Sequence, residues 1–539
     1  MDCLPAEVGY EATGDRVGLT LCVNRERTMP RRWLAALAAA LIAGSAWSAE
    51  DRAATFRCSA RGGRDWREYR SKHFFLDTDG SLLQADLLLK RLETMEAMVL
   101  QALLGEQAEI PGRVRVIAFS SPSDFSELSG SQRVAGYFIT GQFGEPTIVL
   151  PFSGLDTEPE VVAHELAHHI SWHLFPRQPR WFAEGLAYFV QTVAREEQIE
   201  PATGTHLVRG ERNLSGGVGM MPRDFMAWLN VARVAPMKDL LDWQGREDAA
   251  APRYNLSSWL LYHWLWNNRS KQFSQYQSRL SDAADPMVAW QSAFPEFDPA
   301  KPGALAKLDE ALEQYSHSAR YAFYKVSARG DATFTDAPLS SADVHLYLLG
   351  ARHEKPADGQ AVAELDEALR EDPAQPVAIA WRARLAGTSP LPTLRQAAPV
   401  HPRDWRVWLL IGQAITDADD KAEKEAALRK AVALNPDSAA AQNALAWMLA
   451  KGKKAKEALP FANRAVDLAP WDPAAIDTLA AVAADLGQCE QAMVLQHRAL
   501  EMLDPKLSSA DAFRQRLGDY EGRCRKAESG KGTESPAAR

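Results

Sequence analysis

The chain has 539 residues, of which 46% are hydrophobic and 24% are charged, a composition typical of globular domains. A chain of this length has room for roughly two or three hydrophobic cores. Its net charge is −9 and its isoelectric point is about 5.8, which is unlike the basic surfaces that bind nucleic acid or anionic membranes. We therefore expect no nucleic-acid partner.

A short apolar segment near the start predicts export. Met29-Pro30-Arg31-Arg32 is basic, the run from Trp33 to Ala46 is apolar, and Ser48 and Ala49 follow it. This order is typical of a secretory signal peptide at 29–49, and the run is short for a membrane span. A retained anchor and an Ala-rich helix are the alternatives. Because signal peptides begin at the initiator, we expect Met29 to be the true start and residues 1–28 to be an over-extended reading frame. We expect a periplasmic or secreted protein with no membrane span in its mature chain.

Strand and helix patterns alternate between residues 65 and 150. Strands are expected at 72–77 and 113–119, a long amphipathic helix at 82–104, a short helix after 120–123, and a hairpin formed by 134–139 and 147–150. These elements predict a small mixed sheet. Its outer strand could bind a substrate backbone by strand addition, or it could be paired or covered, and the sequence leaves both open.

The motif His164-Glu165-Leu166-Ala167-His168 carries the chemistry. Residues four apart lie on one face of a helix, so His164 and His168 can point at one metal ion. Glu165 lies about 100° round the same turn, beside that ion instead of on it. This is the arrangement of a zinc hydrolase, in which a carboxylate takes a proton from metal-bound water. A chance match within a core helix is the alternative.

The residues around this motif predict the helix that it needs. Thr157 and Glu160 form a capping-box pattern, with Pro159 in the first turn, where its missing N–H is harmless. Val162, Leu166 and Ile170 then recur every four residues, which predicts one buried face.

A third ligand is expected from the next helix. Glu184 lies sixteen residues after His168, and Pro176 and Pro179 between them predict a chain reversal into a second helix. Two His and one Glu leave one coordination position for water, which is the open arrangement of catalytic zinc. An HExxH motif followed by Glu184 within Trp181–Phe189 (WFAEGLAYF) resembles the gluzincin metallopeptidases, in particular the peptidase MA-like families. The resemblance implies that His164, His168 and Glu184 bind one Zn²⁺ per chain, with Glu165 as general base.

Other polar residues of this half have less certain roles. A phenol or imidazole often stabilises the oxyanion in zinc peptidases, so Tyr254, Tyr188 and His263 are candidates, with core packing as the alternative for each. His169 and His173 point away from the predicted ligand face and are expected to pack or to lie at the surface. The Gly-rich segment 215–219 is expected to be a flexible loop lining the cleft, and 256–266 a buried helix.

The second half has a 34-residue period. Pro402, Pro436 and Pro470 are spaced at this interval, and Pro505 falls one residue off the series. The segments before them are similar, and the pattern resembles the tetratricopeptide repeat (TPR). The resemblance implies stacked helix pairs over 340–527 with a protein partner on the concave face; buttressing of the first domain is the alternative. Residues 528–539 are expected to be disordered.

Two cysteines of this half are expected to form a disulfide. Cys489 should begin the second helix of the last repeat, and a closing helix should end near Cys524. Antiparallel packing of consecutive helices would bring the two together in an oxidising compartment.

The sequence thus predicts an α+β zincin-like catalytic domain (a small mixed sheet plus helices) at 59–330, followed by an all-α TPR superhelix. The expected function is zinc-dependent hydrolysis of peptide bonds in a peptide or protein substrate, with the repeats recruiting a substrate or partner. The alternative is a catalytically inactive TPR scaffold or adaptor whose metal domain is structural.

Overall fold

The computed structural model describes residues 63–531 apart from 106–107, 131–133, 142, 154–156, 195–214, 224, 226–232, 246–250, 319–320, 329, 331, 354–357, 417–419 and 504–508. The side chains at 215, 358, 509 and 524–531 are also outside the described part. Residues 1–28 and the predicted signal peptide at 29–49 lie outside it. Among the described residues, no helix is both long enough and apolar enough to cross a membrane.

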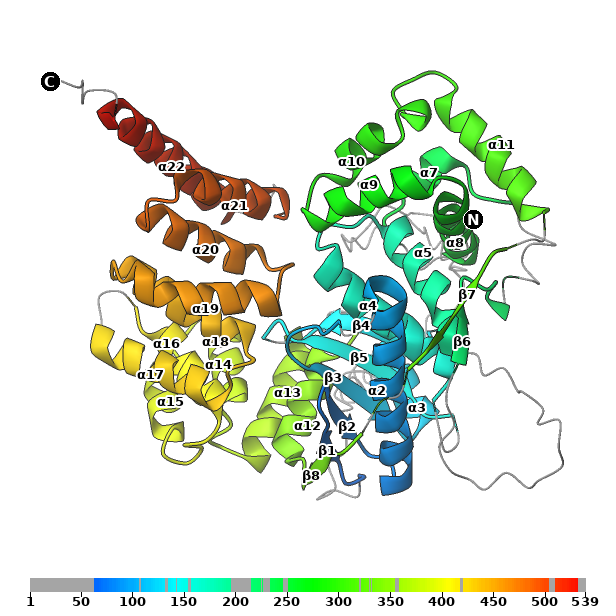
Figure 1. The fold of residues 1–539 in the computed structure, drawn as a ribbon. Helices are drawn as coiled ribbons and strands as arrows, with labels where there is room; N and C mark the ends of the chain where they lie inside the picture. The colour runs from blue at the N-terminus through cyan, green and yellow to red at the C-terminus, as the bar shows by residue number, and fades with distance from the viewer. Residues whose placement is uncertain are drawn as a thin grey trace, which may run out of the picture. The chain divides into compact units, whose positions relative to one another are not determined.

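A six-stranded mixed sheet lies at the centre of the first half (Figure 1). Its strand order is β4-β5-β3-β2-β1-β8; β2, β3 and β5 are parallel, and the remaining neighbours are antiparallel. The strands are β1 (Arg67–Arg70), β2 (Phe74–Thr78), β3 (Val114–Phe119), β4 (Tyr137–Thr140), β5 (Pro146–Pro151) and β8 (Thr335–Pro338). The predicted small mixed sheet is confirmed, and β4 of the predicted hairpin is an edge strand. The strand β1 and the second edge strand, β8, were not predicted.

The alternation of side chains along the central strands gives the sheet two buried faces. Val116 and Ile148 join a core with α2 and α4, whereas Ile117 and Val149 join a second core that includes α3. The helices of this half are α2 (Leu82–Leu104), α3 (Pro122–Ser129), α4 (Pro159–Leu174), α5 (Arg180–Val190), α7 (Met237–Leu241), α8 (Ala251–Asn268), α9 (Ser270–Ser281), α10 (Pro286–Ala293) and α11 (Ala304–Ser316). The expected helices at 82–104 and 256–266 are both found, the first with its predicted bounds.

The segment expected to be a flexible Gly-rich loop is a strand, and that prediction was wrong. β6 (Ser215–Val218) pairs antiparallel with β7 (Tyr324–Ser327). The hydroxyl of Thr192, just after α5, donates a 2.6 Å hydrogen bond to the carbonyl of Gly217. Backbone pairing with a distant strand needs no side chains, so the glycines do not prevent it.

The second half is a TPR-like array of helix pairs. The helices are α12 (Ser341–Gly350), α13 (Asp358–Glu371), α14 (Pro376–Leu385), α15 (Leu391–Ala397), α16 (Trp405–Ala414), α17 (Lys421–Leu434), α18 (Ala439–Lys451), α19 (Ala455–Leu468), α20 (Pro473–Asp485), α21 (Cys489–Glu501) and α22 (Ser509–Lys531). From α16 to α21, first helices begin 34 residues apart and so do second helices, which confirms the predicted period. Gly412 lies against the side chain of Leu428, so a larger residue there would separate α16 from α17.

The end of the array differs partly from expectation. Helix α21 begins at Cys489, as predicted, and Cys489 is disulfide-bonded. The side chain of Cys524, the expected partner, lies outside the described residues. Helix α22 continues to Lys531, so the first four residues of the segment expected to be disordered are helical.

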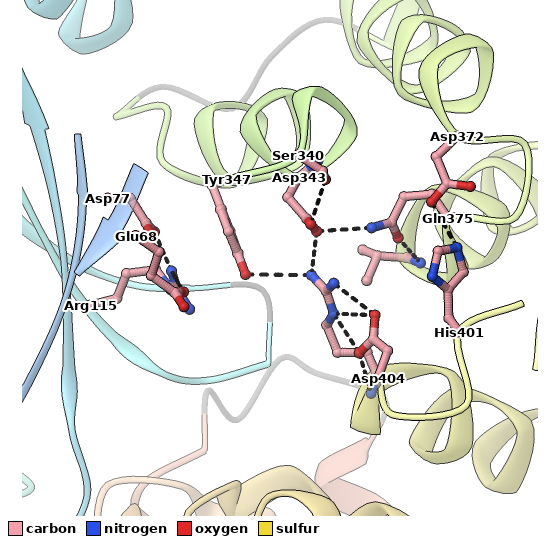
Figure 2. Close-up of polar contacts among 12 residues, drawn as sticks. Glu68, Asp77, Arg115, Ser340, Asp343, Tyr347, Asp372, Gln375, His401 and Asp404 are labelled. Atoms are coloured by element: carbon pink, nitrogen blue, oxygen red, sulfur yellow. Dashed lines mark hydrogen bonds and ion pairs between the residues drawn. The ribbon is translucent and has the colours of Figure 1, made fainter. Parts of the chain in front are cut away.

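The first repeat helices are joined to the sheet by apolar and polar contacts. Val344 and Leu348 of α12 share the core on the α3 face of the sheet. Figure 2 shows the polar part: Tyr347 lies between Arg115 of β3 and Arg406 of α16, with the Arg115 guanidinium carbon 4.1 Å from the ring centroid. These contacts fix the start of the array against the domain that carries the HExxH helix.

Candidate metal centre

The helix α4 carries the HExxH motif with one face buried against the sheet. Val162, Leu166 and Ile170 are completely buried, as their spacing predicted. The predicted capping box was wrong, because the N-cap is Glu158 and not Thr157, and its side chain makes no capping hydrogen bond. A residue that precedes proline is held in an extended conformation, and Pro159 therefore makes Glu158 the last non-helical residue.

The three predicted ligands lie together at the contact between α4 and α5. The Nε2 atoms of His164 and His168 are 3.1 Å apart. The carboxylate oxygens of Glu184 lie 3.6 Å from Nε2 of His164 and 3.5 Å from Nε2 of His168. One ligand atom from each residue lies within 4.8 Å of the other two. The structure therefore brings these residues together from two helices, as the sequence predicted, while their binding of a metal stays a prediction.

The orientation of His164 is set by a residue that the sequence analysis missed. Nδ1 of His164 lies 2.9 Å from Oε1 of Gln191, whose Nε2 donates to Glu160 at 3.3 Å. Since Oε1 of Gln191 can only accept, Nδ1 of His164 carries the proton, and Nε2 presents its lone pair to the site. Metal-binding histidines are commonly oriented in this way. Gln191 follows Glu184 by seven residues, and this helical spacing could have revealed it.

Glu184 is held close to the two histidines by tight packing of α5 on α8. Gly185 lies so near to α8 that a Cβ atom there would be 2.6 Å from the carbonyl oxygen of Ser258. Oε1 of Glu184 is buried and makes no hydrogen bond, although Nη2 of Arg180 lies 2.8 Å away in an ion pair. A buried carboxylate whose two oxygens face two imidazole nitrogens fits a metal ligand. The donor set of two imidazoles and one carboxylate suits zinc.

The pKa values of His168 and Glu184 place these two side chains in the protonation states that a metal requires. Burial lowers the pKa of His168 to about 3, so its imidazole is neutral at pH 7. Burial raises the pKa of Glu184, but His168, His164 and Arg180 outweigh that effect and bring it to about 2. The pKa of His164 lies above its ordinary value. Burial acts to lower it, but the neighbouring carboxylates of Glu184 and Glu165 outweigh burial. Metal ligands must be deprotonated to bind an ion, so a bound cation would take the place of the proton on His164.

Glu165 lies beside the ligands and is only 6% exposed. Burial raises the pKa of its carboxyl to about 7, against the opposing influence of His164. A carboxyl group with a pKa near neutral can both accept and return a proton at physiological pH. This is the property expected of the predicted general base.

Tyr188, among the three candidates for oxyanion stabilisation, contacts a predicted ligand. Its ring centroid lies 4.6 Å from that of His164, and its hydroxyl accepts a hydrogen bond from Asn255. Tyr254 instead stacks on Trp243. His263 is completely buried, and its two ring nitrogens lie 2.8 Å from the hydroxyl of Tyr315 and the carbonyl of Ala322. The structure therefore favours the packing alternative for Tyr254 and His263.

His169 and His173 pack away from the three predicted ligands. The ring of His169 lies against Phe138 of the edge strand β4. The ring of His173 lies against Trp471, at 4.7 Å between centroids. Both histidines therefore have the packing role that the sequence analysis expected.

Comparisons with known proteins found similar solved structures, several of them TPR proteins, but no family. No protein-family model matches the chain, and no curated protein matches it. Similar solved structures include MamA from Desulfovibrio magneticus, at 21% identity, which covers 30% of this chain and 98% of its own with a TM-score of 0.23. A thermophilic TPR protein of Thermus thermophilus is 22% identical and covers 30% of this chain and 91% of its own, with a TM-score of 0.24. YrrB, a TPR protein with an unusual peptide-binding site, is 17% identical and covers 29% of this chain and 83% of its own, with a TM-score of 0.23. At TM-scores this far below 0.5, these similarities carry no argument about the fold or the function of the chain.

Proposed function

We propose that this chain is a zinc-dependent metallopeptidase of the gluzincin type, exported to the periplasm or secreted, whose TPR-like array recruits a substrate or partner protein. One observation carries the proposal, namely the convergence of His164, His168 and Glu184 from two helices with the buried Glu165 beside them. The comparisons contribute nothing to the hydrolase part, which rests on this geometry and on the HExxH motif.

Each side chain has a distinct task in this proposal. His164, His168 and Glu184 would hold the zinc ion, which when bound polarises a carbonyl and lowers the pKa of water. The Glu165 carboxylate accepts a proton from the attacking water and returns it to the leaving amine nitrogen. Gln191 keeps the Nε2 lone pair of His164 directed at the site through its 2.9 Å hydrogen bond. The edge strand β4 offers unpaired backbone groups that a substrate peptide could pair with.

The decisive experiment removes the base without removing the ligands. Glu165→Gln should keep its zinc and its fold, because this side chain is not among the proposed ligands. It should lose its activity, because an amide cannot accept the proton. Its cleavage rate on a mixed peptide library should fall by about 10²–10⁴ relative to the wild type, and a chelator should stop wild-type cleavage.

Two histidine variants of the same helix complete the design. His168→Ala should lose one equivalent of zinc and all activity, measured by elemental analysis and by cleavage. His173→Ala, at the position that packs on Trp471, should retain both. Loss of zinc from His173→Ala with retention by His168→Ala would show that the ligand assignment is wrong.

The second candidate function is that of a protein-binding scaffold with a non-catalytic metal domain. It is favoured by a cavity of about 480 Å³ in the repeats, lined by Trp408, Ile411, Lys430 and neighbouring residues of α15 to α17. The ammonium group of Lys430 lies 3.6 Å from the ring centroid of Trp408, so the wall combines an aromatic surface with positive charge. If wild type and Glu165→Gln both retain zinc, both fail to cleave, and both bind one partner through residues 340–505, the scaffold is correct.

A further inference from the structure

A second group of metal-binding side chains lies at the contact between β2 and α2. His73 immediately precedes β2, while Glu93 and Glu96 lie one turn apart on α2. One ligand atom from each of the three residues lies within 4.8 Å of the other two. Both carboxylates are buried, at 4% and 3% exposure for Glu93 and Glu96. These elements are different from the two helices that bring together His164, His168 and Glu184.

The hydrogen bonds of this group leave one carboxylate unsatisfied. Glu93 is bound twice by His73, with the backbone N–H donating to Oε1 at 3.0 Å and Nδ1 lying 2.6 Å from Oε2. Oε2 of Glu96 lies 3.1 Å from the same Nδ1 but is buried without a hydrogen bond. A buried carboxylate oxygen that receives no hydrogen bond is costly, because it has lost its water and gained no donor.

The charges of the group are also unbalanced. Two buried carboxylates face one imidazole, so the group carries at least one net negative charge when both are ionised. The single imidazole of His73 lies within 3.1 Å of an oxygen of each carboxylate, and even when protonated it supplies only one positive charge for the two. A divalent cation would neutralise both carboxylates and replace the proton of His73.

We propose that His73, Glu93 and Glu96 form a second cation site, which binds a divalent transition metal of the Mn²⁺ or Zn²⁺ class through Nδ1 and two carboxylate oxygens. One imidazole and two carboxylates are donors that suit these metals. Bonds of about 2.0–2.2 Å place neighbouring ligand atoms roughly 3 Å apart. The 3.1 Å between Nδ1 and Oε2 of Glu96 fits this spacing, whereas Nδ1 and Oε2 of Glu93, at 2.6 Å, would have to move apart on binding. The side chain of His73 is 23% exposed, which leaves water a path to the remaining coordination positions. A bound ion would tie the start of β2 to the middle of α2.

The test counts metal ions in full-length protein that has been stripped with a chelator and then dialysed against Mn²⁺ or Zn²⁺ alone. The wild type should bind two equivalents, and His168→Ala should bind one. The double variant His168→Ala with Glu96→Gln should bind none. Its matched control is Glu109→Gln in the same background, because Glu109 is an exposed acid paired with nearby Lys72 and outside the cluster. This control should keep the remaining equivalent.

The outcomes separate this site from the one formed by His164, His168 and Glu184. A single equivalent in the wild type that disappears in His168→Ala overturns the second site and leaves the first intact. A single equivalent that survives His168→Ala and disappears with Glu96→Gln supports the second site and overturns the first. If the Glu96 variant does not fold, His73→Ala in the same background replaces it, and retention of the metal there also overturns the proposal.

Discussion

Replacing Gly185 by alanine should destabilise the protein and disturb the predicted metal site. A Cβ atom at position 185 would lie 2.6 Å from the carbonyl oxygen of Ser258 and 2.8 Å from Cβ of Tyr262, both on α8. Neither atom can move by rotating a side chain, so α5 must shift away from α8. Overpacking of this kind costs about 1–3 kcal/mol, whereas alanine normally stabilises a helix by about 0.5–1 kcal/mol relative to glycine. We expect a net loss of about 1–2 kcal/mol.

The assay is urea unfolding, with the zinc affinity of the folded variant measured in parallel. Gly518→Ala is the matched control, because Gly518 lies in α22 with no atom near the position of an added Cβ. That variant should gain about 0.5–1 kcal/mol and bind zinc as the wild type does. Zinc affinity should fall in Gly185→Ala, because the shift of α5 carries the adjacent Glu184 with it. Equal stability of the two alanine variants would refute the reasoning.

Three further predictions concern the repeats. Arg406→Met should lower the free energy of unfolding by about 1.5–3 kcal/mol, because the partly buried carboxylate of Asp343 loses its 2.8 Å ion pair and keeps only the hydrogen bonds from Ser340 and Gln375. Burial raises the pKa of Asp343, but Arg406 and Ser340 outweigh it and hold the pKa below its ordinary value. This stabilisation is therefore present above about pH 4 and lost as the pH falls further, so Asp343→Asn should cost less in urea midpoint at about pH 3 than at pH 7. Reduction of the disulfide should cost about 2–4 kcal/mol, and mass mapping of unreduced protein should pair Cys489 with Cys524; free thiols at both positions would contradict this.

The periodicity of the sequence was sufficient to predict those features that a single helix determines by itself. The amphipathic pattern predicted both ends of α2, and the structure shows a capping box of Ser81 and Gln84 at its start and a C-cap at Gly105. The four-residue spacing of the histidines placed both on the side of α4 that faces Glu184. These features depend on the geometry of a single helix, which the sequence encodes directly.

Features that depend on distant pairing were not predictable in this way. Strand β8 is Thr-Asp-Ala-Pro, four exposed residues with no alternating apolar pattern, and it is a strand because it pairs with β1. The same is true of β6, whose glycines predict a loop until β7 is placed beside it. The contact of Gln191 belongs to this class too: its spacing from Glu184 marks it as a residue near the site, but its partner His164 lies on another helix.

The packing of α4 determines which experiment can separate an enzyme from a scaffold. One side of this helix presents His164 and His168 to α5, and the turn after His168 presents Trp172 and His173 to Trp471, just ahead of α20. His173 has an Nε2 atom that is buried without a hydrogen bond, so its burial depends on the aromatic packing that Trp471 supplies. Deleting the repeats would therefore expose this face of the helix that carries two predicted ligands. A truncated protein that fails to cleave peptides would not distinguish a lost partner-binding module from a disturbed metal site. Substitution of Glu165 leaves both the repeats and the predicted ligands in place, and it alone isolates the proton transfer.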